Sequence, residues 1–198
     1  EIIDHVAESS KFQPHFHIPL QSGSDPVLKA MRRRYRTALY RERIEALRNV
    51  LPNASIGVDV ITGFPNETEA AFAETQAFLL DLPISYLHVF TYSERARTTA
   101  PRMQESVPVE VRKARTKQLR MLSLKMQRQH YDRFVGTSKP VLFEESTEDG
   151  LRFGYTPEYV RVGIDAQAVE ANQIAPVQIH TVHAAGYASG SIANPTPA

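Results

Sequence analysis

Short apolar runs alternate with helical patterns in the first half of the chain, and this alternation is the strongest constraint on its fold. We expect strands at HFHIPL (15–20), at IGVDVI (56–61) and at Ile84–Tyr92, each followed by turn residues. Strands separated by helices at this spacing are typical of parallel pairing with right-handed crossovers. Three strands leave an open sheet edge, so we expect further strands upstream of residue 15.

Helix starts are expected at Asp25-Pro26, near Thr37, at Asn66 and after Val107-Pro108. A carboxylate followed by proline is a typical first turn, and Asn66 with Glu69 resembles a capping box. The last of these helices is long and basic.

A different pattern begins after Gly136. Short apolar runs follow one another with turn-rich stretches between them, and the tail 193–198 is expected to fray. This pattern predicts a small antiparallel barrel built from strands at Pro140–Glu145, Leu151–Tyr155, Tyr159–Ile164 and Ile174–Val182.

The net charge of +1 hides an uneven distribution. Eight Lys or Arg residues lie within 29–48 and eight more within 112–133. After residue 141 there are seven acidic residues and only two arginines. Basic helices of this kind either contact a phosphate backbone or form solvated faces.

The 198 residues contain no cysteine, which excludes disulfides and thiolate metal sites within them. Since there is also no apolar run of eighteen residues, we expect no membrane span. The first residues, EIID, lack Met and the pattern of a signal peptide, as in a piece of a longer protein or a processed chain.

Three loops follow the predicted strands, at the edge where parallel folds bind ligands. The residues Gln21-Ser22-Gly23-Ser24-Asp25 suit ribose hydroxyls or a carboxylate, or form only a turn and a cap. Gly63–Asn66 forms the second loop. In the third, Tyr92-Ser93-Glu94-Arg95 either positions an anionic group through Arg95 or is a surface turn.

Two further features of the strands carry open interpretations. His15 and His17 are expected on one strand face; a metal site needs a third ligand and none is evident, so we expect a packed or pocket-lining pair. Asp59 lies in a strand that looks buried, so its carboxylate is expected to be either paired or functional.

Four segments in a consistent order resemble the later part of the radical SAM methylthiotransferase family. They are HFHIPLQSGSDPVLKAMRRRY, DVITGFPNETEAAF, LHVFTYSERARTTA and GYTPEYVRV. The last resembles the start of the family's terminal RNA-binding β-barrel, the TRAM domain. RRRY, YSER and GYTPEYVRV are most similar to the branch acting on threonylcarbamoyladenosine beside the tRNA anticodon, and the isopentenyladenosine branch is the nearer rival.

The resemblance implies an α/β plus all-β chain. Residues 1–135 are then the C-terminal half of a partial (β/α) radical SAM barrel with a long basic connecting helix, and residues 136–198 an OB-like, TRAM-type antiparallel barrel. The N-terminal half of the enzyme would lie outside this sequence.

The resemblance also implies a chemistry and its cofactors. A complete enzyme of this family holds two [4Fe–4S] clusters, one of them on a CxxxCxxC loop, and uses S-adenosyl-L-methionine (SAM) both as radical source and as methyl donor. It replaces an adenine C–H with a methylthio group in tRNA in the cytoplasm. Without cysteines, these residues alone are expected to be inactive.

Carried over to this sequence, the family pattern implies contacts with SAM from all three loops. They are expected from Gln21, Ser22, Gly23, Ser24, Ile61 and Gly63, and from the backbone around Phe90–Tyr92. Arg95 is expected to meet either substrate or the SAM carboxylate.

The sequence departs from the family's common GxIxGxxE pattern. It has Asp59 and Asn66 where Gly and Glu are expected, so only the adenine packing by Ile61 and Gly63 is supported. The small residue expected near Arg97 is also absent.

RNA contacts are expected on both halves of the chain. Because the barrel is acidic, we expect Tyr155, Tyr159 and Arg161 to contact RNA locally, while Arg32, Arg33, Arg34 and the long basic helix attract phosphates. An RNA-binding module without catalysis, or a fragment of another parallel-barrel enzyme, remains the alternative.

Overall fold

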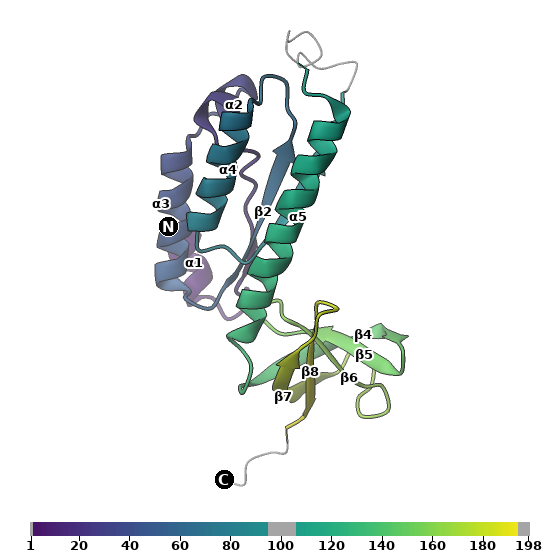
Figure 1. Ribbon diagram of the computed structural model, residues 1–198. Helices are drawn as coiled ribbons and strands as arrows, with labels where there is room; N and C mark the ends of the chain where they lie inside the picture. Colours follow the sequence, from purple (N-terminus) through teal and green to yellow (C-terminus); the bar gives the residue numbers. More distant parts are fainter. Residues whose placement is uncertain (1, 95–105, 194–198) are drawn as a thin grey trace. The chain divides into compact units, whose positions relative to one another are not determined.

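The computed structural model describes residues 2–94 and 106–193, which divide into two compact units (Figure 1). The first comprises Glu1–Ser9 and Phe16–Lys125, and the second Ser10–His15 and Met126–Ala198. The division falls within a helix rather than after residue 135, and a functional domain boundary at 135/136 stays a prediction.

The elements in chain order are α1 (Ile2–Glu8), β1 (His15–His17), α2 (Asp25–Ala30), α3 (Thr37–Val50), β2 (Ser55–Thr62), α4 (Glu69–Asp81), β3 (Tyr86–Thr91), α5 (Val109–Asp132), β4 (Ser138–Glu148), β5 (Leu151–Tyr155), β6 (Arg161–Asp165), β7 (Ile174–Val182) and β8 (Ala188–Ile192).

The first unit contains a three-stranded sheet in the order β1-β2-β3. Strands β2 and β3 pair in parallel, with Gly57 opposite Tyr86 and Thr62 opposite Thr91. The segment after β1 continues along β2, where Gln21 bridges Val60 in parallel. The expected parallel strands are therefore confirmed, and the ends that β2 and β3 share carry the predicted loops.

The two faces of β2 have different surroundings. Ile56, Val58 and Val60 are fully buried on the face that helices cover, and Figure 1 shows α4 and α5 alongside this strand. On the other face, Asp59 and Ile61 are partly exposed. Gly57 shares that face with Tyr86, and a Cβ at position 57 would lie 2.3 Å from the tyrosine ring.

Two predicted helix caps are wrong in detail. Helix α2 begins at Asp25 with Ser24 at the N-cap, and Asp25 Oδ1 instead accepts a hydrogen bond from the Thr37 amide, the first residue of α3. Asn66 does not cap α4, because its φ is 68° and the N-cap is Thr68, whose hydroxyl accepts from the Ala71 amide at 3.1 Å. Capping thus depends on which residue has extended geometry as much as on its type.

The second unit contains a closed barrel in the order β4-β5-β6-β8-β7. The predicted barrel is confirmed, but it is not wholly antiparallel, because β6 and β8 pair in parallel. Strand β8 was not predicted and supplies the closing partner for both β6 and β7. The barrel core is apolar and includes Val141, Phe143, Val160, Val162, Val177 and Ile179.

Within residues 2–94 and 106–193, no helix is both long and apolar enough to cross a membrane.

Candidate functional site

The loop after β1 is fixed to β2 through its backbone. The Gln21 amide donates to the Asp59 carbonyl at 2.8 Å, and the Gln21 carbonyl accepts from the Ile61 amide at 2.9 Å. Gln21 has a φ of 76°, so the chain turns sharply where the strand ends. This turn places the predicted Gln21–Ser24 loop at the carboxyl edge of the parallel sheet.

The serines of this loop face α4. Ser24 Oγ donates to Glu74 Oε2 at 2.7 Å, and Ser22 Oγ lies 3.3 Å from Thr75 Oγ1. A Cβ at Gly23 would lie 2.8 Å from the Thr75 Cα, so the loop can approach the helix only with glycine here. Both serines are almost completely buried, and their hydroxyls already have protein partners. The side chain of Gln21, which is 9% exposed, has no hydrogen-bond partner among residues 2–94 and 106–193, so it is the side chain of this loop that remains for a ligand.

The loop after β2 rests on a buried ion pair. Glu67 Oε1 accepts from the Gly63 amide at 3.0 Å and lies 2.7 Å from an Arg115 guanidinium nitrogen, which also donates to the Glu67 carbonyl. Arg115 contacts Glu69 at 2.9 Å. Burial raises the pKa of the Glu67 carboxyl, although the Gly63 amide and Arg115 act in the opposite direction.

The loop after β3 is tied to α5 by Arg112. Its guanidinium donates to the Val107 carbonyl at 2.6 Å, to Ser106 Oγ at 2.6 Å and to Glu94 Oε1 at 3.1 Å. The aliphatic part of Arg112 also lies against Gly63, whose φ is 76°. Arg112 therefore connects two of the three predicted loops.

These buried arginines were counted in the sequence as surface cations of a basic helix. Arg112 is 6% exposed and Arg115 5% exposed, so neither is available to a phosphate backbone. Their positions precede the buried Leu119 by seven and four residues, which is the spacing of one helix face. That spacing was the available signal for their burial.

The face of the sheet not covered by helices carries polar and aromatic side chains. His17 Nε2 lies 2.8 Å from Asp59 Oδ1, so the carboxylate is paired; this oxygen is buried, although the Asp59 side chain as a whole is 20% exposed. The His17 ring lies 5.1 Å from the His88 ring. Among the described residues no group of His, Asp or Glu side chains has the arrangement of a metal site.

Ile61, which is predicted to pack against adenine, lies on the same face. Ile61 pairs with Phe90, which is 53% exposed, next to the turn at Gly63. Tyr92 packs edge-on against Phe64 at 5.3 Å, and its buried hydroxyl has no hydrogen-bond partner within the described part of the chain. Arg95 and Arg97 lie outside the described residues.

The basic turn between α2 and α3 is exposed. Arg32, Arg33 and Arg34 are all on the surface, and Arg32 has a φ of 57°. The next residue, Tyr35, donates its hydroxyl to the Leu20 carbonyl at 2.9 Å. The turn is thus held next to the start of the Gln21 loop.

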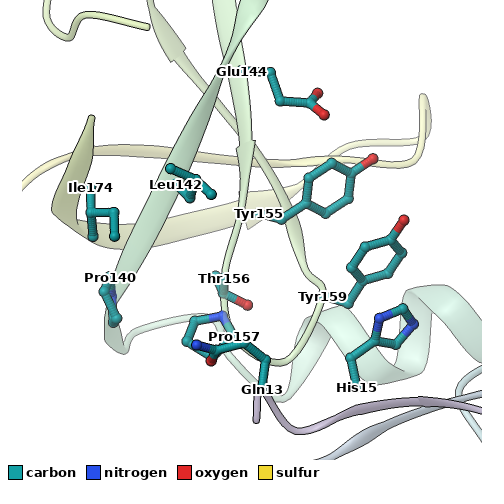
Figure 2. A pocket seen from close by; sticks show the side chains of 10 residues that line it. All are labelled: Gln13, His15, Pro140, Leu142, Glu144, Tyr155, Thr156, Pro157, Tyr159 and Ile174. Carbon is teal, nitrogen blue, oxygen red and sulfur yellow. The ribbon is translucent and has the colours of Figure 1, made fainter. Parts of the chain in front are cut away.

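The predicted RNA-contacting tyrosines form a stack with His15 in the second unit, whereas His17 has partners in the first. Tyr159 lies between the other two rings, with centroids 3.8 Å from His15 and 4.5 Å from Tyr155 (Figure 2). Both faces of Tyr159 are therefore covered. The guanidinium of Arg161 lies 3.9 Å from the Phe153 ring centroid and is only partly exposed.

Comparison with known sequences finds relatives over most of the chain. The sequence model of the radical SAM superfamily matches residues 1–79. A threonylcarbamoyladenosine tRNA methylthiotransferase of Bacillus subtilis is 37% identical over 82% of this chain and 37% of the relative. A tRNA-2-methylthio-N(6)-dimethylallyladenosine synthase of Thermobifida fusca is 40% identical over 73% of this chain and 29% of the relative.

The chain belongs to the radical SAM methylthiotransferase family. It spans little more than a third of the length of the first of these relatives. Coproporphyrinogen III oxidase from Escherichia coli, a radical SAM enzyme, has a similar structure, with a TM-score of 0.51, 14% identity and coverage of 90% of this chain and 43% of that one. This likeness supports a shared fold and no more.

Proposed function

We propose that this chain is part of an enzyme that places a methylthio group on threonylcarbamoyladenosine in tRNA, in the cytoplasm. The observation that carries the proposal is the similarity over more than four fifths of the chain to enzymes named for this activity, from Bacillus subtilis and Rickettsia prowazekii, at 37% and 38% identity. The dimethylallyladenosine branch is the second candidate, because a relative from that branch is 40% identical over a shorter segment.

The residues at the carboxyl edge of the sheet fit SAM. Ile61 and Phe90 offer an apolar surface on which an adenine can pack, and the turn at Gly63 follows directly after it. The side chain of Gln21 and the hydroxyl of Tyr92, which has no hydrogen-bond partner among the described residues, are polar groups near the same edge. When bound with a reduced cluster, SAM supplies the radical and the methyl group. The residues of this chain orient it and exclude water.

Ser22, Gly23 and Ser24 are proposed to act on SAM through the backbone of their loop, because the serine hydroxyls are used against α4. The [4Fe–4S] clusters do not fit this chain, which has no cysteine, so their ligands must come from other residues of the enzyme. We propose further that residues 136–198 form a TRAM-like RNA-binding domain.

The activity is tested by the nucleosides of tRNA. The gene that encodes this chain is expressed in a strain without its own methylthiotransferases, and digested tRNA is analysed by mass spectrometry. Methylthiolated threonylcarbamoyladenosine is expected. The methylthio form of dimethylallyladenosine would support the second candidate. The absence of both products would refute the proposal.

Binding of SAM to the chain tests the placement of the site. Gln21→Ala should weaken SAM binding in calorimetry by about 0.5–1.5 kcal/mol, the typical value of one hydrogen bond. Gln118→Ala is a matched control, because Gln118 is an exposed glutamine of α5 whose side-chain oxygen accepts a hydrogen bond from Gln76. Binding of tRNA without SAM would favour an RNA-binding module instead.

A further inference from the structure

The barrel unit contains a pocket of about 410 Å³ that the SAM site does not use. It lies entirely within the second unit, and Figure 2 shows its lining side chains around a common space. The lining residues are Gln13, His15, Pro140, Leu142, Glu144, Tyr155, Thr156, Pro157, Tyr159 and Ile174.

One side of the pocket is formed by the aromatic stack. Tyr159 has both faces covered by its neighbours, so it cannot stack on a ligand without displacing one of them. Tyr155 ends the stack and lines the pocket. A planar ring placed against Tyr155 would continue the stack, and such aromatic contacts are tolerant of the identity of a nucleobase.

The opposite side is apolar and exposed. Leu142 and Ile174 are neighbours across β4 and β7 and are 51% and 67% exposed. Apolar side chains gathered in a hollow favour a flat apolar ligand.

The charges of the lining residues indicate which part of an RNA would enter. None of the ten lining residues is Lys or Arg, so the pocket does not attract a phosphate. Glu144 is the one acid among them, and its carboxylate can accept hydrogen bonds from the amino or imino groups of a base.

We propose that this pocket holds one unpaired nucleobase of the bound tRNA, stacked on Tyr155 with an amino or imino edge toward Glu144. The inference rests on the proposed tRNA substrate and adds a specific contact to it. In this arrangement Tyr155 touches the base, whereas Tyr159 and His15 position Tyr155.

The test uses the full 198-residue chain and an anticodon stem–loop RNA that carries fluorescent 2-aminopurine at one unpaired position at a time. Stacking quenches this base, so binding should quench it strongly at one position. Tyr155→Ala should abolish the quenching and weaken binding by about 5- to 100-fold, the range expected for loss of one stacked base. Tyr155→Phe keeps the ring and should retain the quenching.

The apolar wall is tested by a substitution that the fold should tolerate. Leu142→Asn changes an exposed side chain and should reduce the quenching, whereas Ile192→Asn changes a 38% exposed side chain of β8 outside the pocket and should not. Circular dichroism checks that both variants keep the barrel.

The role of Glu144 is tested by a double comparison. Purine lacks the amino group of 2-aminopurine, so replacing 2-aminopurine with purine should weaken binding to the wild-type chain about 5-fold or more. The same replacement should have a smaller effect on binding to Glu144→Gln, because a hydrogen bond to a charged group is stronger than one to a neutral group. An equal effect on both chains would remove Glu144 from the contact.

The outcomes separate the inference from the proposed function. If RNA binds with no quenched position, or if quenching survives in Tyr155→Ala and Leu142→Asn, the proposed base contact in the pocket is wrong. Neither result contradicts the proposed tRNA substrate. Failure to bind RNA at all overturns both. If Leu142→Asn instead changes the molecular mass of the protein assembly measured by sedimentation, the pocket contacts a second copy of the chain. The proposal that the pocket holds a nucleobase would then be wrong.

Discussion

At the scale of single residues, Gly63 meets two separate requirements. Its φ of 76° favours glycine, and a Cβ would lie 2.2 Å from Cγ of Arg112. Gly150 has nearly the same φ of 77°, but nothing lies within 4 Å of its Cβ position. Comparing substitutions at Gly63 and Gly150 therefore separates the free-energy cost of the left-handed backbone conformation from the cost of steric crowding.

Gly63→Ala should therefore destabilise the chain more than Gly150→Ala. The left-handed conformation costs about 1–2 kcal/mol at either site, and crowding against Arg112 should add about 1–3 kcal/mol at position 63 alone. Urea unfolding followed by circular dichroism measures both variants against the wild type. Equal losses would mean that Arg112 moves aside without cost.

Tyr131 should make the barrel sensitive to alkaline pH. Burial raises the pKa of its hydroxyl to about 12, so the folded state keeps the proton after the unfolded state begins to lose it near pH 10. Its contribution is complete below pH 10 and is lost between pH 10 and 12, by at most about 1.4 kcal/mol per pH unit.

Thermal unfolding between pH 9 and 11.5 checks this expectation. The melting temperature of the wild type should fall more steeply than that of Tyr131→Phe, which has no proton to lose. Parallel pH profiles would show that Tyr131 is not responsible.

At the scale of elements, α5 holds two ligand loops in place through buried charges. The pair of Arg115 with Glu67 is buried, and the amide of Gly63 depends on the same carboxylate. Such a pair contributes little net stability compared with apolar residues, but loss of one partner leaves a buried charge without compensation.

Arg115→Ala should therefore lower the free energy of unfolding by about 3–5 kcal/mol. Lys117→Ala, two positions along the same helix and exposed, should change it little. Adding Glu67→Gln to Arg115→Ala removes the uncompensated charge, so the double variant should be more stable than the single one. Urea denaturation of the four proteins gives the result, and a double variant no better than Arg115→Ala would contradict it.

The predictability of these elements follows from where their partners lie. Strands β2 and β3 and the buried stripe of α3 were predictable, because apolar periodicity within the segment produces them. Strand β8, with the sequence ASGSI, has no such pattern and forms because β6 and β7 need a closing partner. Pairing of that kind depends on the assembled barrel.

The candidate site shows the same division. The three loops were located from turn residues that follow strands. The hydrogen-bonding roles of Ser22, Ser24 and Asp25 could not be predicted from the sequence. Their respective partners, Thr75, Glu74 and Thr37, are brought next to them only by tertiary packing.

At the scale of the whole molecule, the number of free cations is smaller than the sequence suggests. Arg112 and Arg115 are buried, whereas the turn Arg32–Arg34 is exposed and the barrel is acidic. The exposed turn thus stays a candidate for phosphate contacts, together with exposed cations of α5 such as Lys117, Arg120 and Lys125. Each phosphate contact adds about 0.7–0.9 to the slope of log affinity against log salt.

Replacement of Arg32, Arg33 and Arg34 by alanine should lower tRNA affinity and flatten this slope by up to about two units. Tyr155→Ala should lower affinity at every salt concentration and leave the slope nearly unchanged, because stacking releases no counterions. Filter binding at several salt concentrations distinguishes the two effects. An arginine variant with wild-type affinity and slope would mean that the turn is only a solvated surface.

The close approach of Gly57 to Tyr86 has a consequence for how this family diversifies. The tyrosine ring occupies the space that a side chain at position 57 would need, so the two positions share one volume. Relatives with a larger residue at the first position should carry a smaller one at the second. An alignment should then show the two positions covarying in side-chain volume across the β2–β3 pair, even where neither residue is invariant.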